Sequence, residues 1–500
     1  MTCLLVASRP AAEAAEGEKT LTDLRQKMDE QLDQPRFAAA MWGIKVESME
    51  SGKVLYERNA AKLFSPASNS KLYTVALGFE ALGADYQTHT SLYARKKPGR
   101  GGVLKSDLVI YGRGDPGVNA RLHNNDIFAA LQPLATAVRN AGIRKISGDL
   151  IADESYFHGS PYGSGWSWDD MENYYGAEIS ALTLNDNCAQ ITVKPGDRVG
   201  APCRLSLSPG NSYVILSNLT TTGAAGSRRA IHLYRPLEQN LVYVRGQVGI
   251  GQPEVTEDVT LHDPAGFFAM MFREALRRQG IKVTGKTRAI HWQEREKAPF
   301  EEKDWIEIGS MASQPMSQIA REILKPSQNL YTDLLLAQIG ERNRGPDENK
   351  EITSEDLGIR ALDRFLPQAG IKKGDVLFEE GSGLSRNNLT TPNATVALLR
   401  YMNGRPSAAA YKEALPIAGV DGTMRNRLKG TSAEGNARAK TGTLRWANSL
   451  SGHLTTAAGE HLIFSIMLNR YHNSEPAHSA RAEIDTIVLR LANFEGKSAE

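Results

Sequence analysis

The chain has 500 residues, of which 41% are hydrophobic and 23% are charged, and its formal net charge is +2. This composition is typical of a soluble globular protein, and the length indicates roughly two to four domains. The small net charge gives no argument for a nucleic-acid partner, and no apolar run approaches the roughly 18 residues that a transmembrane segment needs.

The first nineteen residues leave two interpretations open. A short apolar run at 4–7 is followed by small residues at 12–14, as in an export signal, but the basic start of such a signal is missing. Residues 1–19 are therefore either an export leader or a disordered tail.

The next elements in chain order are a helix, a hairpin and a second helix. Residues 20–34 have an amphipathic pattern, and two β-rich runs at 41–46 and 53–58 flank a turn signal. The second helix is expected to begin at Ser68, because Pro66 disfavours helix before it and a serine can cap it. Its apolar residues are spaced as one helix face: Leu72, Val75, Ala76, Phe79 and Leu82.

The middle of the chain indicates a loose repeat and an all-β stretch. Three segments each give an apolar-faced helix, a Gly-Ile pair and a strand, with the glycine as the expected helix C-cap. The pairs are Gly142-Ile143, Gly280-Ile281 and Gly370-Ile371. Residues 188–262 are rich in Val, Ile, Leu and Thr between Pro-Gly turns, which predicts a small all-β unit. Its two cysteines, Cys188 and Cys203, either form one disulfide or remain two buried thiols.

The last third of the chain returns to helices and then to strands. Residues 316–340 have a helical apolar period that is broken at Pro326, and two β-rich runs joined through 457–459 predict a second hairpin. A terminal helix follows, with Ile484 and Leu491 on its apolar face. The outer parts of the chain are thus expected to be α and antiparallel β, and the middle mostly β.

A serine and a lysine at the start of the second helix are the first candidate for chemistry. Ser68 and Lys71 are three residues apart and share a helix face. A serine hydroxyl is a poor nucleophile until a base takes its proton, and a lysine is such a base only when burial or another cation destabilises its ammonium. The alternative is an ordinary helix cap with a surface lysine.

Two distant strings support the chemical interpretation. Ser327-Gln328-Asn329 follows Pro326 in the break between two helical runs, where side chains of a loop can point into a cleft. Lys440-Thr441-Gly442-Thr443 precedes the second hairpin and is expected on a strand, where Gly442 would allow a ligand backbone to approach. Each string alone is also consistent with a turn or a strand entry. The order Ser-x-x-Lys, Ser-x-Asn, Lys-Thr-Gly is, however, a known signature of penicillin-recognising serine enzymes.

A string that resembles a nucleotide-binding loop is set aside. Residues 280–287 fit G-x-x-x-x-G-K-[ST], but that loop needs a strand before it and a helix after it. Here the predicted order is reversed, so a helix cap and a strand turn are favoured over an NTPase. The chain also contains no His-Glu-x-x-His, Cys-x-x-Cys or Gly-x-Ser-x-Gly string.

With these motifs the chain resembles the class C low-molecular-mass penicillin-binding proteins, the serine D-alanyl-D-alanine carboxypeptidases/endopeptidases. The likeness spans nearly everything from residue 35 to the end, including the long stretch between Lys71 and Ser327. Further shared strings lie at 112–116, 165–170, 175–177, 180–182, 381–386 and 421–423. One departure is Glu380, where the family usually has aspartate.

The resemblance implies an α+β multidomain fold. It consists of a penicillin-binding/β-lactamase-like transpeptidase domain, an antiparallel sheet flanked by helices, with two inserted, mostly β domains, one nested in the other. The expected boundaries are 20–89 with 306–500 for the catalytic domain, 90–184 with 279–305 for inserted domain II, and 185–278 for nested domain III.

The resemblance also implies acyl transfer on peptides that end in D-Ala-D-Ala. Ser68 is the expected nucleophile, and Lys71, held neutral partly by the charge of Lys440, the expected base; Ser327 would relay a proton to the leaving amine. Substrate contacts are expected from Asn329, Lys440, Thr441 and Thr443, and the oxyanion hole from the N–H groups of Ser68 and Thr443. Asp153 matches a family carboxylate that contacts a diaminopimelyl amine, although it is equally an ordinary aspartate at a strand end.

The remaining expectations concern partners and alternatives. Peptidoglycan stem peptides are the expected substrates and β-lactam antibiotics the inhibitors, without metal, cofactor, nucleic acid or transmembrane segment, in the periplasm or another extracytoplasmic space. A serine β-lactamase of the same fold and a catalytically silent peptidoglycan-binding module are the alternatives. Neither the balance of carboxypeptidase and endopeptidase activity nor the oligomeric state is predicted.

Overall fold

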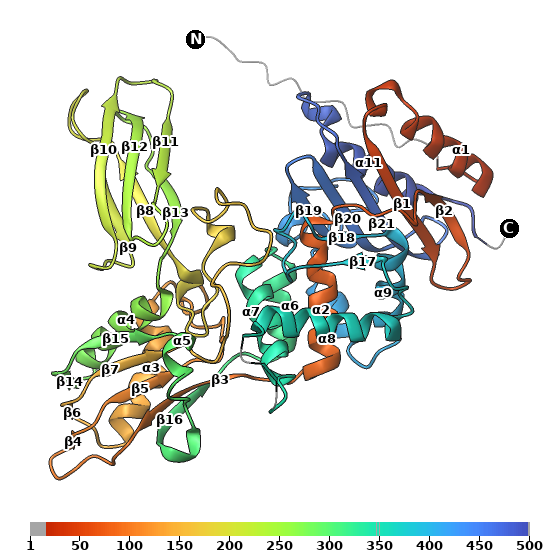
Figure 1. The fold of residues 1–500 in the computed structure, drawn as a ribbon. Coiled ribbons are helices and arrows are strands. Elements are labelled where there is room, and N and C mark those ends of the chain that lie inside the picture. The colour runs from red at the N-terminus through yellow and green to blue at the C-terminus, as the bar shows by residue number, and fades with distance from the viewer. Residues whose placement is uncertain (1–16, 347, 350, 499–500) are drawn as a thin grey trace.

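The computed structural model describes residues 17–346, 348–349 and 351–498 (Figure 1). Residues 1–16, which hold most of the expected leader or tail, lie outside the described residues. A five-stranded antiparallel sheet, here called the central sheet, has the order β19-β20-β21-β1-β2. Its strands are β1 (Met41–Ser48), β2 (Val54–Arg58), β19 (Arg438–Leu444), β20 (Ala447–Thr455) and β21 (His461–Asn469).

Both predicted hairpins lie in the central sheet. β1 pairs with β2, and β20 pairs with β21. The β-rich run before the second hairpin contains two strands, because the chain turns at Trp446, whose φ is 66°, and β19 pairs back onto β20. The Lys-Thr-Gly string therefore lies on β19, which is an edge strand of the central sheet. An edge strand has one side without a neighbouring strand, where a ligand can contact it.

Helices cover both faces of the central sheet. On one face, α1 (Leu21–Leu32) and α11 (Ala480–Asn493) share a buried apolar cluster with β1, β20 and β21. The helices on the other side form a second cluster around α2 (Ser70–Leu82), as Figure 1 shows. These are α6 (Met316–Leu324), α7 (Asn329–Arg342), α8 (Ser354–Phe365), α9 (Pro392–Asn403) and α10 (Ala408–Ala414), next to the short pair β17 (Val376–Leu377) and β18 (Leu389–Thr390).

The start of α2 differs from the sequence expectation. A 3-10 turn, Ala67–Asn69, precedes the helix, and Asn69 rather than Ser68 is the residue at its N-cap. No side chain caps the helix. Ser68 is not a capping residue because its hydroxyl is directed to Lys71 instead. The expected apolar face is confirmed and extends further, since every residue from Ser70 to Phe79 is buried.

A second body of the molecule is built on another five-stranded sheet, here called the inserted sheet, with the order β15-β7-β5-β3-β16. Its strands are β3 (His89–Ala94), β5 (Leu108–Tyr111), β7 (Leu150–Asp153), β15 (Thr287–Ile290) and β16 (Ile306–Ala312). A small sheet of β4 (Val103–Leu104), β6 (Lys145–Ile146) and β14 (Lys282–Val283) lies beside it, and the helices of this body are α3 (Ile127–Asn140), α4 (Pro264–Arg278) and the short α5 (Trp292–Arg295). The three expected cap glycines have φ values of 77°, 76° and 73°, in the left-handed region that glycine adopts readily. For residues 280–287, the helix α4 precedes and the strand β14 follows, so the nucleotide-loop interpretation fails.

The stretch 188–262 is all β, as predicted. It forms two three-stranded sheets with the orders β13-β8-β9 and β10-β12-β11. The strands are β8 (Cys188–Lys194), β9 (Arg204–Ser208), β10 (Ile215–Gly223), β11 (Ala230–Tyr234), β12 (Leu241–Gly249) and β13 (Val255–Thr260). Cys188 and Cys203 are buried and free, so the thiol alternative describes this structure and the disulfide does not.

The domain boundaries remain a prediction, and two contacts bear on where they belong. β16 pairs with β3 in the inserted sheet, although the expected boundary assigns residues from 306 onward to the catalytic domain. α4 packs on β7 and β15, although the expected boundary assigns it to the nested domain. Among the described residues, none of the helices is long and apolar enough to cross a membrane.

Candidate active site

The three predicted motifs meet at one place. Lys71 of α2 donates to Asn329 Oδ1 at the start of α7, at 2.6 Å. Lys440 of β19 donates to Ser327 Oγ in the α6–α7 break, at 2.7 Å. The structure therefore brings together side chains from three distant parts of the sequence, as the signature requires.

Lys71 Nζ has three close oxygen neighbours. Two of them, Asn329 Oδ1 and the backbone carbonyl of Ser382, are acceptors only, each at 2.6 Å. The third is Ser68 Oγ at 3.0 Å. A neutral amine has two N–H groups and one lone pair, so the two carbonyl oxygens take both hydrogens and the lone pair is directed at the Ser68 hydroxyl. This is the arrangement that a general base needs.

Lys71 and Ser68 differ in how deeply they are buried. The Lys71 side chain is 0% exposed, whereas Ser68 is half-buried. Burial lowers the pKa of Lys71 to about 8, and the carboxyl groups of Asp333 and Glu380 act in the opposite direction. The pKa of Lys440 is lowered well below its usual value, first by burial and then by the charge of Lys71. The repulsion between the two lysines is mutual, because a charge on either one disfavours a charge on the other. The expectation that Lys440 helps to keep Lys71 neutral stays a prediction.

Strained backbone positions flank the reactive groups. Ala67 and Ser327 have φ values of 49° and 67°, which side-chain-bearing residues rarely adopt. The surrounding structure holds the first of these turns: Ser449 Oγ donates to the carbonyl of Pro66, and Asn69 Nδ2 donates to Ser451 Oγ. Sequence reasoning missed this strain, because neither alanine nor serine signals a left-handed conformation.

The strand β19 forms the wall opposite α7. Lys440 is fully buried, whereas Thr443 is exposed. The Thr441 hydroxyl lies 2.7 Å from that of Thr423, in the predicted 421–423 string. A Cβ at Gly442 would overlap Ser449 Oγ and the carbonyl oxygen of Pro66. Glycine is therefore required here by the backbone that carries Ser68, a reason that the sequence analysis did not foresee.

The segment around Glu380 positions an acceptor for Lys71. The Glu380 carboxylate accepts from the backbone N–H groups of Ser382 and Gly383, at 2.8 and 2.7 Å, and from Asn388 Nδ2 at 2.8 Å. These bonds fold the segment into a tight loop whose Ser382 carbonyl faces Lys71. A glutamate thus fills the place where the family usually has aspartate, and both of its oxygens have partners.

Asp153 does not join the site. Its side chain is 0% exposed at the end of β7, and its Oδ2 accepts from Arg295 Nε at 2.8 Å. The predicted contact with a substrate amine requires an accessible carboxylate, so this placement corrects the expectation in favour of the strand-end alternative. The ion pair could not be foreseen, because Arg295 is distant in the sequence.

A loop of the 165–177 region lies at the site instead. The carbonyl of Tyr175 accepts from Asn329 Nδ2 at 2.9 Å. In the same loop, Asp170 forms an ion pair with Arg386 at 3.5 Å, and Trp168 is 71% exposed. The sequence analysis used these strings for the family likeness only and assigned them no role.

Comparison with known proteins gives consistent results. The model of the D-Ala-D-Ala carboxypeptidase 3 (S13) family matches residues 24–491. A D-alanyl-D-alanine carboxypeptidase of Actinomadura sp. (strain R39) is 33% identical over 99% of this chain and 89% of the relative. The crystal structure of penicillin binding protein 4 from Haemophilus influenzae has a TM-score of 0.78 at 23% identity, covering 95% of this chain and 98% of that one.

A second structure of the Haemophilus influenzae protein, complexed with a β-lactam, has a TM-score of 0.71 at 21% identity and covers 95% of this chain and 98% of that one. The predicted α+β multidomain fold and the predicted family are confirmed by these matches. The chain therefore belongs to the D-Ala-D-Ala carboxypeptidase 3 (S13) family, and the protein is a serine-type hydrolase of that family.

Proposed function

We propose that the protein cleaves peptidoglycan stem peptides at D-Ala-D-Ala-type bonds through an acyl-enzyme on Ser68. The observation that carries this proposal is the environment of Lys71 Nζ, whose two carbonyl acceptors leave its lone pair for the Ser68 hydroxyl. An ordinary surface lysine would have neither this burial nor these partners.

The first half-reaction is acylation. Ser68 Oγ attacks the carbonyl carbon of the penultimate residue while Lys71 takes the hydroxyl proton. The carbon–nitrogen bond then breaks, and Ser327 gives its hydroxyl proton to the leaving amine and takes one in turn from Lys440, whose Nζ lies 2.7 Å away. In the second half-reaction, water attacks the ester, Lys71 returns its proton to Ser68 Oγ, and a proton of the water replaces the one that Lys440 gave up.

The negative charge that develops on the reacting carbonyl oxygen needs hydrogen-bond donors to stabilise it. We assign these to the backbone N–H groups of Ser68 and Thr443, each worth about 3 kcal/mol in enzymes of this kind. The approach of β19 to the turn that carries Ser68, which leaves no room for a side chain at Gly442, supports this pairing.

Lys440 and the threonine hydroxyls are suited to the terminal carboxylate of the substrate. Because burial and Lys71 lower the pKa of Lys440, a bound carboxylate favours its charged form. A charged Lys440 in turn repels a proton on Lys71, so carboxylate binding promotes the free base that acylation needs.

For the stem-peptide side chain, Asp170 and Arg386 replace the role that Asp153 was expected to have. They belong to segments beside Asn329 and supply one charge of each sign. Such a pair fits a side chain that carries both an ammonium and a carboxylate.

The cellular site proposed is the periplasm or another extracytoplasmic space, where these substrates occur, and β-lactams are the proposed inhibitors. The wild-type protein is expected to be labelled covalently by a fluorescent penicillin, and Ser68→Ala to lose all labelling, with Ser212→Ala, an exposed serine far from the site, as the control. Labelling of Ser68→Ala would refute the assignment.

The substrate is identified with purified muropeptides, a pentapeptide and a cross-linked dimer, with the products weighed by mass spectrometry. Loss of one alanine indicates a carboxypeptidase, and conversion of dimer to monomers an endopeptidase. Rapid turnover of a chromogenic cephalosporin without either product would indicate a β-lactamase, and labelling without any turnover a silent binding module.

A further inference from the structure

We propose that Asp333 is a positioning residue for acylation: its buried carboxyl group, which borders a partly open cavity, controls whether Lys71 holds a proton. This inference rests on the proposed role of Lys71 as the base. Nothing in the three motifs includes Asp333, which the sequence presents only as one polar residue within an apolar helix.

The position of Asp333 is set by two helices and a loop. It lies one turn after Asn329 on α7, so both side chains share a helix face. On α2, Thr74 lies one turn after Lys71 and donates to the carbonyl of Gly381 at 2.9 Å. A Cβ at Gly381 would lie 3.3 Å from Asp333 Oδ1 and 3.2 Å from Thr74 Oγ1. Asp333 therefore sits directly behind the layer formed by Lys71, Asn329 and the Ser382 carbonyl.

The carboxyl group of Asp333 is unusual in being buried without a hydrogen bond of normal geometry. Its side chain is 3% exposed, and neither oxygen has such a bond within the part of the chain that the structure describes, although the Ser382 side chain is near enough to act on its pKa. A buried polar group without a partner costs free energy, so its retention calls for a role. The role favoured by its position is electrostatic, because the charge of Asp333 acts on the pKa of Lys71.

On its other side Asp333 borders a cavity of about 410 Å³ between the catalytic helices and the inserted region. Ala337 and Asp333 of α7 and Ser354 and Glu355 of α8 line one side of it. The lining of this cavity includes none of the reactive residues Ser68, Lys71, Ser327 and Lys440, so it is distinct from the place where substrate reacts.

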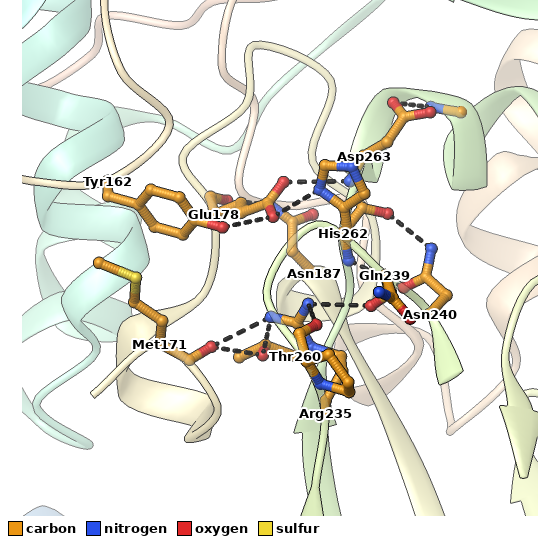
Figure 2. A network of polar contacts seen from close by, with 12 residues as sticks. Tyr162, Met171, Glu178, Asn187, Arg235, Gln239, Asn240, Thr260, His262 and Asp263 are labelled. Atoms are coloured by element: carbon orange, nitrogen blue, oxygen red, sulfur yellow. Dashed lines mark hydrogen bonds and ion pairs between the residues drawn. The ribbon is translucent and has the colours of Figure 1, made fainter. Parts of the chain in front are cut away.

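The charged groups that face Lys71 and Asp333 come from several elements. Glu380, Lys440 and Glu355 lie on the 380–385 loop, β19 and α8. Across the cavity, Glu178 pairs with His262 at 2.9 Å (Figure 2), and Glu154 pairs with His291. Because these two carboxylates have histidine partners, they are partly neutralised, whereas no histidine, lysine or arginine forms an ion pair with Asp333 among the described residues.

The proton balance of the pair is simple. A carboxylate at Asp333 with an ammonium at Lys71 has the same net charge as a carboxylic acid with a free amine, and the two states differ only in the location of one proton. The first state is inactive as a base and the second is active. Burial, Glu380 and Glu355 raise the pKa of Asp333 well above its usual value, which favours the active state, whereas Lys71 favours the inactive one.

The proposal is tested by the pH dependence of acylation. The second-order rate constant for labelling by a fluorescent penicillin is measured from pH 5 to pH 10 for the wild type and Asp333→Asn. Removing the carboxylate takes away a charge that stabilises the Lys71 ammonium. The midpoint of the acidic limb of the pH–rate profile is therefore expected to lie at a pH lower by at least about half a unit, and labelling well below the midpoint is expected to become about threefold faster. The plateau at high pH is expected to stay within about twofold.

A second variant has the opposite expected sign. Glu355→Gln removes a charge that opposes ionisation of Asp333, so its acidic limb is expected to move up, and this shift is expected to vanish in the Asp333→Asn/Glu355→Gln double variant. Glu351→Gln removes an exposed carboxylate that precedes α8, and is the control with an unchanged limb.

Two results would overturn the proposal. The first is a lower plateau in Asp333→Asn with an unchanged midpoint of the acidic limb, which indicates a purely structural role. The second is a midpoint that moves to higher pH in Asp333→Asn. Folding is checked by thermal unfolding, and the isosteric Asn is expected to fold because Asp333 has no hydrogen bond of normal geometry to lose. If the wild-type protein is not acylated at all, the proposed function fails, whereas acylation with identical limbs in both proteins overturns only the role of Asp333.

Discussion

The Nζ atom of Lys440 lies 2.7 Å from the hydroxyl oxygen of Ser327, and the two residues are 113 positions apart in the chain. One comes from the edge strand β19 and the other from the strained break before α7, so this bond joins the strand to the loop between α6 and α7. Because Lys440 also donates to its neighbouring carbonyl at 2.7 Å, one N–H group is left for a substrate anion.

Lys440→Gln is expected to reduce kcat/KM for a peptide that ends in D-Ala-D-Ala by about tenfold to a hundredfold, since a hydrogen bond to a charged group contributes roughly 1.5–3 kcal/mol. A peptide with an amidated C-terminus lacks the anion, so it should be a poor substrate for the wild type and lose little more in the variant. Steady-state kinetics on both peptides checks this. Equal losses on the two peptides would contradict carboxylate recognition by Lys440.

The pH dependence of acylation follows from the lowered pKa of Lys71, about 8. The ammonium form cannot accept the Ser68 proton, so the rate should rise with pH and level off above pH 8. At two pH units below the midpoint the rate should be about a hundredfold lower than the plateau. Stopped-flow labelling of the wild type with a reporter β-lactam measures the profile, and a flat profile between pH 6 and pH 9 would exclude Lys71 as the titrating base.

Gly442→Ala should disturb the site through its backbone. The added methyl group overlaps Ser449 Oγ and the carbonyl of Pro66, and overpacking of this kind costs about 1–3 kcal/mol. We expect a lower midpoint in urea unfolding and slower penicillin labelling, because the turn that carries Ser68 must shift. Gly345→Ala, where a Cβ meets nothing within 4 Å, is the control and should change neither value.

The ion pair of His291 and Glu154 predicts a pH-dependent stability. The Glu154 carboxylate raises the pKa of His291 to about 9 from its ordinary value of 6.5. A raised pKa in the folded state stabilises the fold fully below pH 6.5, and this contribution is lost as the pH rises through 9. The difference in Tm between the wild type and His291→Gln should therefore be present at pH 6 and shrink toward pH 9.5. A difference that is constant across this range would show that the charge of His291 is not involved.

The sequence alone predicted the reactive strings and the elements that carry them, because turn signals and apolar periods are local. It did not predict the positive φ values at Ala67 and Ser327, since contacts with β20 and Lys440 impose them. Asp153 was misassigned for the same reason: whether a carboxylate at a strand end is accessible depends on Arg295, which only the fold brings to it. Asp333 was overlooked because its burial without a normal hydrogen bond is a property of the packed interior.

The pairing of β3 with β16 has a consequence for how such an enzyme can change. Ala94 and Ile306 are direct partners across one antiparallel ladder, so the chain departs and comes back at the same point. For the catalytic domain, which holds Ser68 and Ser327, everything between these two partners is one long hairpin loop whose ends are paired to each other. The entropy of closing a loop grows by only about 0.6 kcal/mol for each doubling of its length. An ancestral enzyme with a short turn here could therefore acquire a large module, or exchange one, without rebuilding its catalytic core.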